Sequence, residues 1–236
     1  MGKTSKPRSS KPGPRGNPEA TRDAILKAAL HEFATEGVAG ARTDAIARAA
    51  GVNKALLYYY YQDKEALYGA VLDHVFRGLV ARVTSVLDQE LPPREKILAY
   101  AAAHFDYIAE SPIYPKVFLG EMIRGGRQIS PHIERIVTQY FRPLQRRLVE
   151  TFREGIARGE VRSVDPQNFI FSMVAMNVFY FASVNFLRTM MDADPLAAER
   201  IAARRAAVLD VLNAALACEP PAEARAPKSP EKGKKR

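Results

Sequence analysis

The sequence lacks most of the features on which small secreted proteins and many enzymes depend. Cys218 is the only cysteine among 236 residues, which excludes an internal disulfide framework. Residues 1–18 contain basic side chains but no apolar stretch that could act as a secretory signal, so a cytoplasmic location is expected. A Gly-rich phosphate loop, a Gly-x-Ser-x-Gly motif and a pair of acids flanking a histidine are also missing. These absences argue against an enzyme, although a helical enzyme or a protein-interaction module stays open as an alternative.

Alternating strand-like runs of Val, Ile and Thr are absent as well. Apolar residues recur instead at helical spacing through nearly the whole chain, which predicts an all-α protein. The first helix is expected to begin at Thr21 as its N-cap and to end at Gly37, and Thr43 and Asn53 are expected to cap the next two. The later helices are expected over residues 64–88, 94–109, 132–157, 166–190 and 196–217, with a short helix after Pro115. No period of 20 to 50 residues repeats, so the chain is not a solenoid.

The net charge of +9 lies mostly at the two ends of the chain. Residues 1–18 carry five basic side chains and no acid, and residues 219–236 carry six basic and three acidic ones. Both ends are rich in Pro, Lys, Ser and Gly, so we expect a flexible basic arm and a flexible basic tail. Their charge indicates either an acidic partner such as nucleic acid or membrane, or simply a contribution to solubility.

Residues 43–64 carry the most specific pattern in the sequence. Two short helical segments are joined by the turn "GVN", and small side chains at Ala47 and Ala50 would let the two helices approach closely. Gly51 supplies the backbone freedom that a sharp turn requires. This arrangement indicates a helix-turn-helix.

Residues 21–67 resemble the N-terminal domain of the TetR family of transcriptional regulators. The matching text is "ILKAALHEFATEG" followed by "RTDAIARAAGVNKALLYYYYQDKEAL". The resemblance implies a three-helix DNA-binding domain over residues 19–66 and a larger helical effector-binding and dimerisation domain over 67–218. It further implies a regulator of double-stranded DNA, most often a homodimeric repressor that binds a palindromic operator and is released by a small, largely apolar effector. No cofactor and no membrane partner are implied.

The four consecutive tyrosines of "LLYYYYQ" cannot all have the same role, because successive helical residues point about 100° apart. We assign Tyr61, together with Leu57, to the packing of the three-helix domain. Tyr58, Tyr59 and Tyr60 are then interpreted as donors to phosphate oxygens, which position a duplex without reading its bases. Packing of all four rings inside the protein is the alternative.

The start of the third helix is expected to reach base edges. Lys54 could donate to guanine, whereas Leu56 could offer an apolar contact to a thymine methyl group or could instead belong to the core. Thr43 and Lys64 are expected near phosphates. The candidate DNA-binding residues are Arg42, Thr43, Asn53, Lys54, Ala55, Leu56, Tyr58, Tyr59, Tyr60 and Lys64. Because residues 19–64 hold six basic and six acidic side chains, the arm at residues 1–18 is expected to add non-specific affinity.

Residues 169–187 form an uncharged run of 19 positions, long enough to suggest a membrane span. Polar residues interrupt it, and we interpret it as a buried helix with one face toward a partner subunit. The candidate dimer residues are Phe179, Val184, Leu187, Ile201, Val208 and Leu212.

An apolar effector pocket is implied by the resemblance, although the same side chains could be ordinary core. The candidate pocket residues are Phe105, Tyr107, Phe118, Met122, Met173, Met176 and Tyr180. Phe179 would suit either role. His104, Asp106, Glu121 and His132 do not follow any known metal-ligand spacing, so no metal site is expected.

Overall fold

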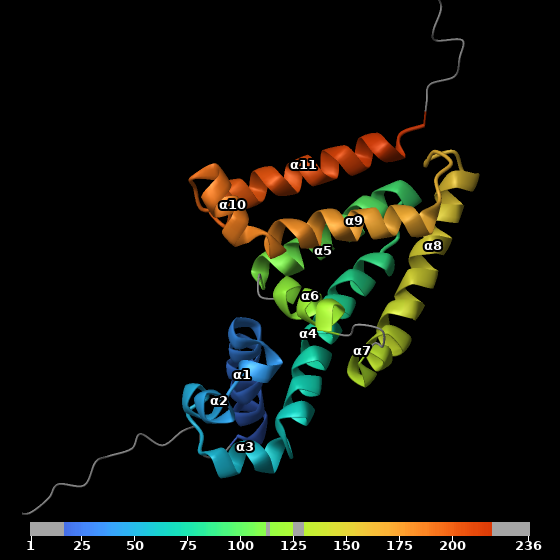
Figure 1. The fold of residues 1–236 in the computed structure, drawn as a ribbon. Helices are drawn as coiled ribbons and strands as arrows, with labels where there is room; N and C mark the ends of the chain where they lie inside the picture. The colour runs from blue at the N-terminus through green and yellow to red at the C-terminus, as the bar shows by residue number, and fades with distance from the viewer. Residues whose placement is uncertain (1–16, 112–113, 125–129, 219–236) are drawn as a thin grey trace, which may run out of the picture.

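The computed structural model describes residues 17–111, 114–124 and 130–218, and all regular elements in these ranges are helical (Figure 1). The prediction of an all-α protein is confirmed. The expected arm at 1–18 and tail at 219–236 lie outside the described residues, except for Asn17 and Pro18. The elements are α1 (Pro18–Gly40), α2 (Thr43–Ala49), α3 (Lys54–Tyr60), α4 (Lys64–Leu87), α5 (Pro93–Glu110), α6 (Tyr114–Arg124), α7 (Pro131–Ile136), the π-helical turn η1 (Val137–Phe141), α8 (Arg142–Ala157), α9 (Pro166–Ala182), α10 (Val184–Met191) and α11 (Ala198–Leu216).

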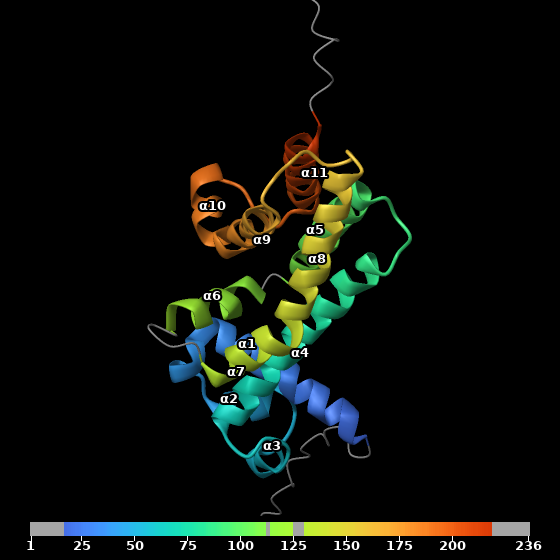
Figure 2. The ribbon, with the colours of Figure 1, turned by 90° about the vertical axis from the view of Figure 1, so that its right-hand side faces the viewer.

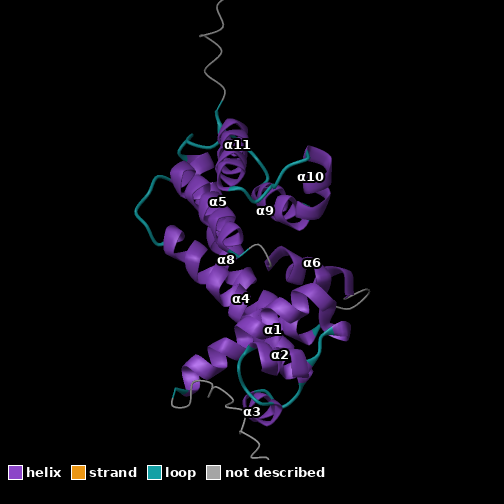
Figure 3. Cartoon of the chain, turned by 90° about the vertical axis from the view of Figure 1, so that its left-hand side faces the viewer, coloured by secondary structure: helices purple, strands orange, loops and turns teal. Residues whose placement is uncertain are grey.

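Helices α1, α2 and α3 form a small head at one end of the molecule, and α4 runs from this head into the larger helical part. In that part α5 packs against α4, α8, α9 and α11. Figure 2 shows α9, α10 and α11 at the end farthest from α3, and Figure 3 shows the loops that join these helices. Helix α6 contacts both α9 and α1, so it connects the larger part to the head.

Several helices begin at the polar caps that their sequences favour. Asn17 accepts hydrogen bonds from the amides of Glu19 and Ala20, and Pro18 occupies the first turn. Asp63 accepts from the amide of Ala66 at 2.7 Å and so caps α4. These bonds satisfy amides that would otherwise have no partner at a helix end.

Two predicted helix starts are wrong. The first helix begins at Pro18, not at Thr21, because Asn17 is the cap; the Thr21 hydroxyl donates instead to the Asn17 carbonyl at 3.1 Å. Thr43 is the first residue of α2, and Arg42 occupies the cap position without a side-chain hydrogen bond to the helix. Gly37 has the expected positive φ of 68°, but its ψ of 171° is not that of a left-handed helical cap. The backbone kinks there, and α1 continues to Gly40.

Two helices expected to be continuous are interrupted. The helix of residues 131–157 contains the π-helical turn η1, in which the amide of Arg142 donates to the carbonyl of Val137. Pro143 follows at once, and this wider turn relieves the clash of its ring with the preceding turn. The expected helix 166–190 bends by 67° between α9 and α10. No single helix in the described ranges has the length and apolar character to cross a membrane, and only this bent pair passes on length and composition.

One apolar core extends through both parts of the chain. Phe33 of α1 meets Tyr68 of α4 edge to face, with 5.0 Å between the ring centroids, which fastens the head to α4. Deeper in the molecule, Phe76 contacts the rings of Tyr114, Phe118 and Phe141 at 5.4 to 5.9 Å. These contacts position α6 and η1 against α4.

Candidate nucleic-acid interface and effector region

The turn between α2 and α3 holds α3 by one side and leaves its other side exposed. Gly51 has a positive φ of 69°, and the amide of Val52 donates to the Ala47 carbonyl at 2.9 Å. Ala47 of α2 is buried, and Leu57, on the inner side of α3, is fully buried. The Asn53 side chain accepts from the amide of Leu56 at 2.7 Å, so its expected capping role is confirmed. The rest of α3 is therefore free to present side chains outward.

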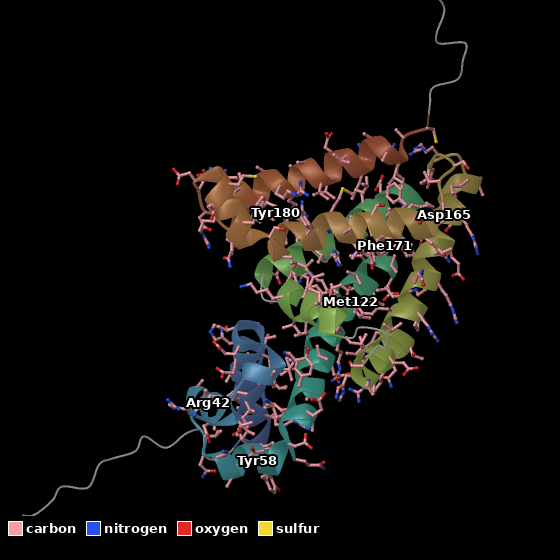
Figure 4. All side chains as sticks on the ribbon, viewed as in Figure 1. Arg42, Tyr58, Met122, Asp165, Phe171 and Tyr180 are labelled. Carbon is pink, nitrogen blue, oxygen red and sulfur yellow. The ribbon has the colours of Figure 1, made fainter. Side chains whose placement is uncertain are left out.

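The four tyrosines differ in exposure. Tyr61 is 4% exposed, so its assignment to packing with Leu57 is confirmed. Tyr60 is half-buried against the core, with its ring 5.4 Å from that of Tyr59. Tyr58 and Tyr59 are 38% and 80% exposed, and Figure 4 shows Tyr58 on the head. Packing of all four rings inside the protein is therefore excluded.

Burial raises the pKa of Tyr61, whose hydroxyl lies 3.5 Å from the Arg22 carbonyl. The guanidinium of Arg22 lies over the same ring at 5.7 Å from its centroid. The hydroxyl thus sits at the edge of the packed ring, where a polar atom keeps access to partners.

A polar network joins α2 to α3 on the exposed side of the head. The Lys54 ammonium lies 2.9 Å from the Asp44 carboxylate and 6.0 Å from the centre of the Tyr58 ring. The Tyr58 hydroxyl lies 3.1 Å from the Thr43 hydroxyl. The hydrogen bond to Asp44 raises the pKa of Lys54, and the same bond lowers the pKa of Asp44. This carboxylate was missed from the sequence, although its position directly after Thr43 could have drawn attention to it.

The other candidate DNA-binding residues differ in exposure and in hydrogen bonding. Arg42 is exposed, and its amide donates to the Glu32 carboxylate at 3.0 Å (Figure 4). Ala55 is exposed and Leu56 is half-buried. The ammonium of Lys64 donates to the carbonyls of residues 39 and 41, at 3.3 Å each. Lys64 thus satisfies carbonyls at the end of α1, a role that the sequence did not reveal.

Two family models match the chain. The model described as "Bacterial regulatory proteins, tetR family" covers residues 25–71, which include α2, α3 and most of α1. The model described as "Tetracyclin repressor-like, C-terminal domain" covers residues 93–212, half of the whole chain. The chain belongs to the TetR family of transcriptional regulators. It is therefore a DNA-binding regulator and not an enzyme.

Curated relatives agree with this assignment. The transcriptional repressor SCO4008 of Streptomyces coelicolor is 34% identical over 161 residues, which cover 68% of this chain and 78% of that protein. The transcriptional regulator RutR of Escherichia coli is 30% identical over 161 residues, covering 68% of this chain and 74% of its own.

Among solved structures, the ketosteroid transcriptional regulator KstR2 of Mycobacterium tuberculosis matches with a TM-score of 0.69 and 19% identity. The match covers 89% of this chain and all of that one. At this identity the likeness shows the TetR fold alone.

The candidate effector residues of this TetR-family chain are spread over several packing layers. Phe105 and Met173 are fully buried, and Phe105 packs on Phe181 at 5.2 Å between ring centroids. The Tyr107 hydroxyl donates to the carbonyl of residue 75 at 2.7 Å, and Phe118 belongs to the cluster around Phe76.

Three further candidates lie nearer the surface. Met122 is 45% exposed, whereas Met176 is half-buried. The Tyr180 hydroxyl donates to the Pro195 carbonyl at 2.7 Å, and Arg204 lies over its ring. Burial raises the pKa of Tyr180. Figure 4 labels Met122 on α6 and Tyr180 on α9. An effector pocket lined by these seven residues stays a prediction.

A hollow of about 320 Å³ lies where α1, α4 and α6 meet. It lies at the junction of the head and the larger part, away from the expected pocket. Its lining residues are Phe33, Ala34, Glu36, Gly37, Val38, Ala39, Tyr68, Lys116, Val117 and Gly120.

Half of the candidate dimer residues lie in the core of the protomer. Val184, Val208 and Leu212 are 7%, 2% and 2% exposed, so they are corrected to core residues that hold α10 and α11 in place. Leu187 and Ile201 are half-buried, and Phe179 is 69% exposed. The large exposed apolar side chains of this region are instead Phe171, Phe179, Phe186, Met190, Met191 and Val211.

Within the described residues, no three His, Cys, Asp or Glu side chains come close enough to hold a metal ion. His104 bonds to Asn177, Asp106 forms a bidentate pair with Arg205 at 2.7 and 2.9 Å, and His132 faces Glu65. The Glu121 side chain lies outside what the structure describes.

Proposed function

We propose that this TetR-family regulator is a homodimeric repressor that binds a palindromic operator and is released by a small, largely apolar effector. The observation that carries the proposal is the exposed face of α3, which presents Lys54, Tyr58 and Tyr59 beside a well-packed core. The relative SCO4008 is named a transcriptional repressor, which supports repression over activation. We place the protein in the cytoplasm, where bacterial DNA is accessible.

In this proposal the start of α3 enters the major groove, as recognition helices do. Lys54 and Ala55 face base edges, and the half-buried Leu56 offers its exposed part to a thymine methyl group. Tyr58, Tyr59 and Thr43 donate hydroxyl protons to phosphates, and Arg42 adds a charge at the edge of α2. Tyr60 and Lys64 are half-buried, and their exposed atoms contact phosphates in this proposal. The basic residues 1–18 add affinity that does not depend on sequence.

Dimerisation would use the exposed face formed by α9 and α11. Phe171 and Phe179 stand on one stripe of α9, and the exposed stripe of α11 consists largely of alanines. Small side chains allow two helices to approach closely, so the rings of one subunit fit against the alanines of its partner. A two-fold axis between these faces pairs two heads, which suits a palindromic site.

Release requires an effector that prefers one spacing of the two heads. Helix α6 is suited to pass this preference on, because it contacts α9 on one side and α1 on the other. An effector bound beside α9 would shift α6, and the contact of α6 with α1 would then move the head.

Selection of bound fragments from the source genome tests this function. The full chain is mixed with sheared genomic DNA at moderate salt, and retained fragments are sequenced. We expect a small set of fragments that share a palindrome, and the bound protein should migrate as a dimer. Retention of no discrete fragment, or of fragments without a common site, would contradict the proposal.

A further inference from the structure

One polar pair lies inside the otherwise apolar contact between α5 and α9. Asn177 of α9 is fully buried, and the residues one turn before and after it, Met173 and Phe181, are fully buried as well. Opposite Asn177 stand Ala101 and His104 of α5. An apolar side chain would suit this position, so the presence of an amide needs a reason.

The hydrogen bonds fix the orientation of the amide. The nitrogen Nδ2 of Asn177 lies 3.2 Å from the Ala101 carbonyl and 3.0 Å from Nδ1 of His104. An amide nitrogen only donates, so Nδ1 of His104 accepts and the ring proton resides on Nε2. The remaining atom, Oδ1 of Asn177, is buried and has no hydrogen-bond partner.

This pattern differs from that of a purely structural polar residue. A buried amide that only sets the register of two helices is expected to have both its oxygen and its nitrogen paired. Here the amide nitrogen of Asn177 donates to two acceptors, whereas its oxygen has no hydrogen-bond partner. Burial lowers the pKa of His104 to about 4, so the pair is neutral at ordinary pH and attracts no particular sign of charge.

We propose that Asn177 Oδ1 is the polar anchor of the effector site, and that the effector is a neutral molecule with an apolar body and one O–H or N–H donor. The apolar body packs against Met173, Phe105 and Phe181, and the donor completes the hydrogen bonding of Asn177. The ligand would lie between α5 and α9, and α9 also contacts α6, the helix that reaches the head. The inference rests on the proposed function, since it names the effector class of that regulator.

Matched probe molecules test the anchor without DNA. Phenol and toluene have similar shapes, as do indole and indene, but only phenol and indole carry a donor. Their affinities for the full chain are measured by isothermal titration calorimetry with the wild type, Asn177→Leu and Asn177→Ala. Gln145→Leu is the control, because it removes an exposed amide of α8 and leaves the proposed site unchanged. Circular dichroism checks that each variant is folded.

We expect the wild type and Gln145→Leu to prefer the donor-bearing probe by roughly 5- to 10-fold, as one hydrogen bond would give. Both Asn177 variants should lose this preference. In crystals of the wild type with phenol, the hydroxyl should lie about 3 Å from Oδ1. Equal affinities within each pair, no binding of any probe, or a water molecule that stays on Oδ1 in saturated crystals would overturn the inference.

The outcomes also separate this site from the proposed function. A small molecule that releases DNA with equal affinity for the wild type and Asn177→Leu would support the function and refute the anchor. Donor-dependent binding at Asn177 in a protein that selects no DNA would support the anchor and refute the function.

Discussion

At the scale of single residues, Asp44 limits what Lys54 can do. Its carboxylate holds the ammonium at 2.9 Å and adds a negative charge to the face proposed to meet phosphates. To reach a base, Lys54 must give up this partner. Both side chains are half exposed, so the pair itself stabilises the fold little.

We therefore expect Asp44→Asn to bind operator DNA more tightly, by roughly 3- to 10-fold at low salt. The removed negative charge would no longer repel the phosphates, so the logarithmic salt slope should steepen. Fluorescence anisotropy over a salt series measures both. The matched control is Glu154→Gln on α8, which removes one of the two acidic partners of Arg158 and should leave the affinity unchanged. Unchanged or weaker binding by Asp44→Asn would contradict this role.

His104 makes the stability of the protein depend on pH. The unfolded chain binds a proton near pH 6.5, whereas burial delays protonation in the folded state to about pH 4. The folded state is therefore favoured above pH 6.5 and loses this stability as the pH falls toward 4. His104→Gln keeps an acceptor for Asn177 but does not titrate.

We expect the wild type to lose on the order of 2–3 kcal/mol more than His104→Gln between pH 7 and pH 4.5. Urea unfolding at the two pH values measures this difference, and the other three histidines are common to both proteins. Equal losses of unfolding free energy in the two proteins would show that His104 is not kept neutral by burial.

Residue roles could be predicted from the sequence where the resemblance to the TetR family bears on them. That resemblance assigned the Tyr61 ring to packing with Leu57, and the ring is buried. The ion pair of Asp44 and the bonds of Lys64 join residues 10 to 25 positions apart, and no local pattern reveals such partners. Thr43 was taken for a cap because its residue type favours that position, but the chain enters α2 one residue earlier.

At the scale of helices, the close approach of α8 to its neighbours depends on Gly155. A Cβ atom there would lie 2.7 Å from Cγ2 of Val161 and 3.1 Å from Cβ of Pro93, both on stiff, buried side chains. Gly120 of α6 is different, because a Cβ atom there meets nothing within 4 Å.

Gly155→Ala should therefore destabilise the protein by about 1–3 kcal/mol through overpacking. Gly120→Ala should stabilise it by about 0.5–1 kcal/mol, because alanine favours a helix where space is open. Equilibrium urea unfolding of the two variants measures both changes in the free energy of unfolding. A neutral or stabilising effect of Gly155→Ala would mean that α8 packs less tightly than described.

The helices themselves could be predicted because apolar spacing and Pro or Gly boundaries are local signals. Their interruptions could not. The bend between α9 and α10 lies within an uninterrupted uncharged run. Pro143 marks the place of η1 in the sequence, but a proline alone does not show whether a helix widens into a π-helical turn or ends there. The scatter of the candidate pocket residues has the same cause, since a pocket depends on tertiary packing.

At the scale of the whole molecule, the account requires two heads held by one dimer face. Phe179→Glu places a charge on the exposed α9 stripe and should convert the dimer to a monomer. Operator binding should weaken by roughly 100-fold or more, because two linked heads bind far more tightly than one. Light scattering after size exclusion measures the mass.

The control for that substitution is Gln145→Glu, which puts the same charge on an exposed position of α8. This variant should stay dimeric and keep its operator affinity. A dimeric Phe179→Glu variant would place the interface elsewhere.

The central claim is that the exposed side of α3 lies in the groove of operator DNA, and site-directed cleavage tests it most directly. An iron chelate is attached to Ala55→Cys on α3, or to Gln145→Cys on α8, with the exposed Cys218 replaced by serine. Strong cleavage is expected from position 55 in two clusters placed symmetrically about the operator centre, and none is expected from position 145. Cleavage from position 55 no stronger than from position 145, in a complex that still forms, would contradict it.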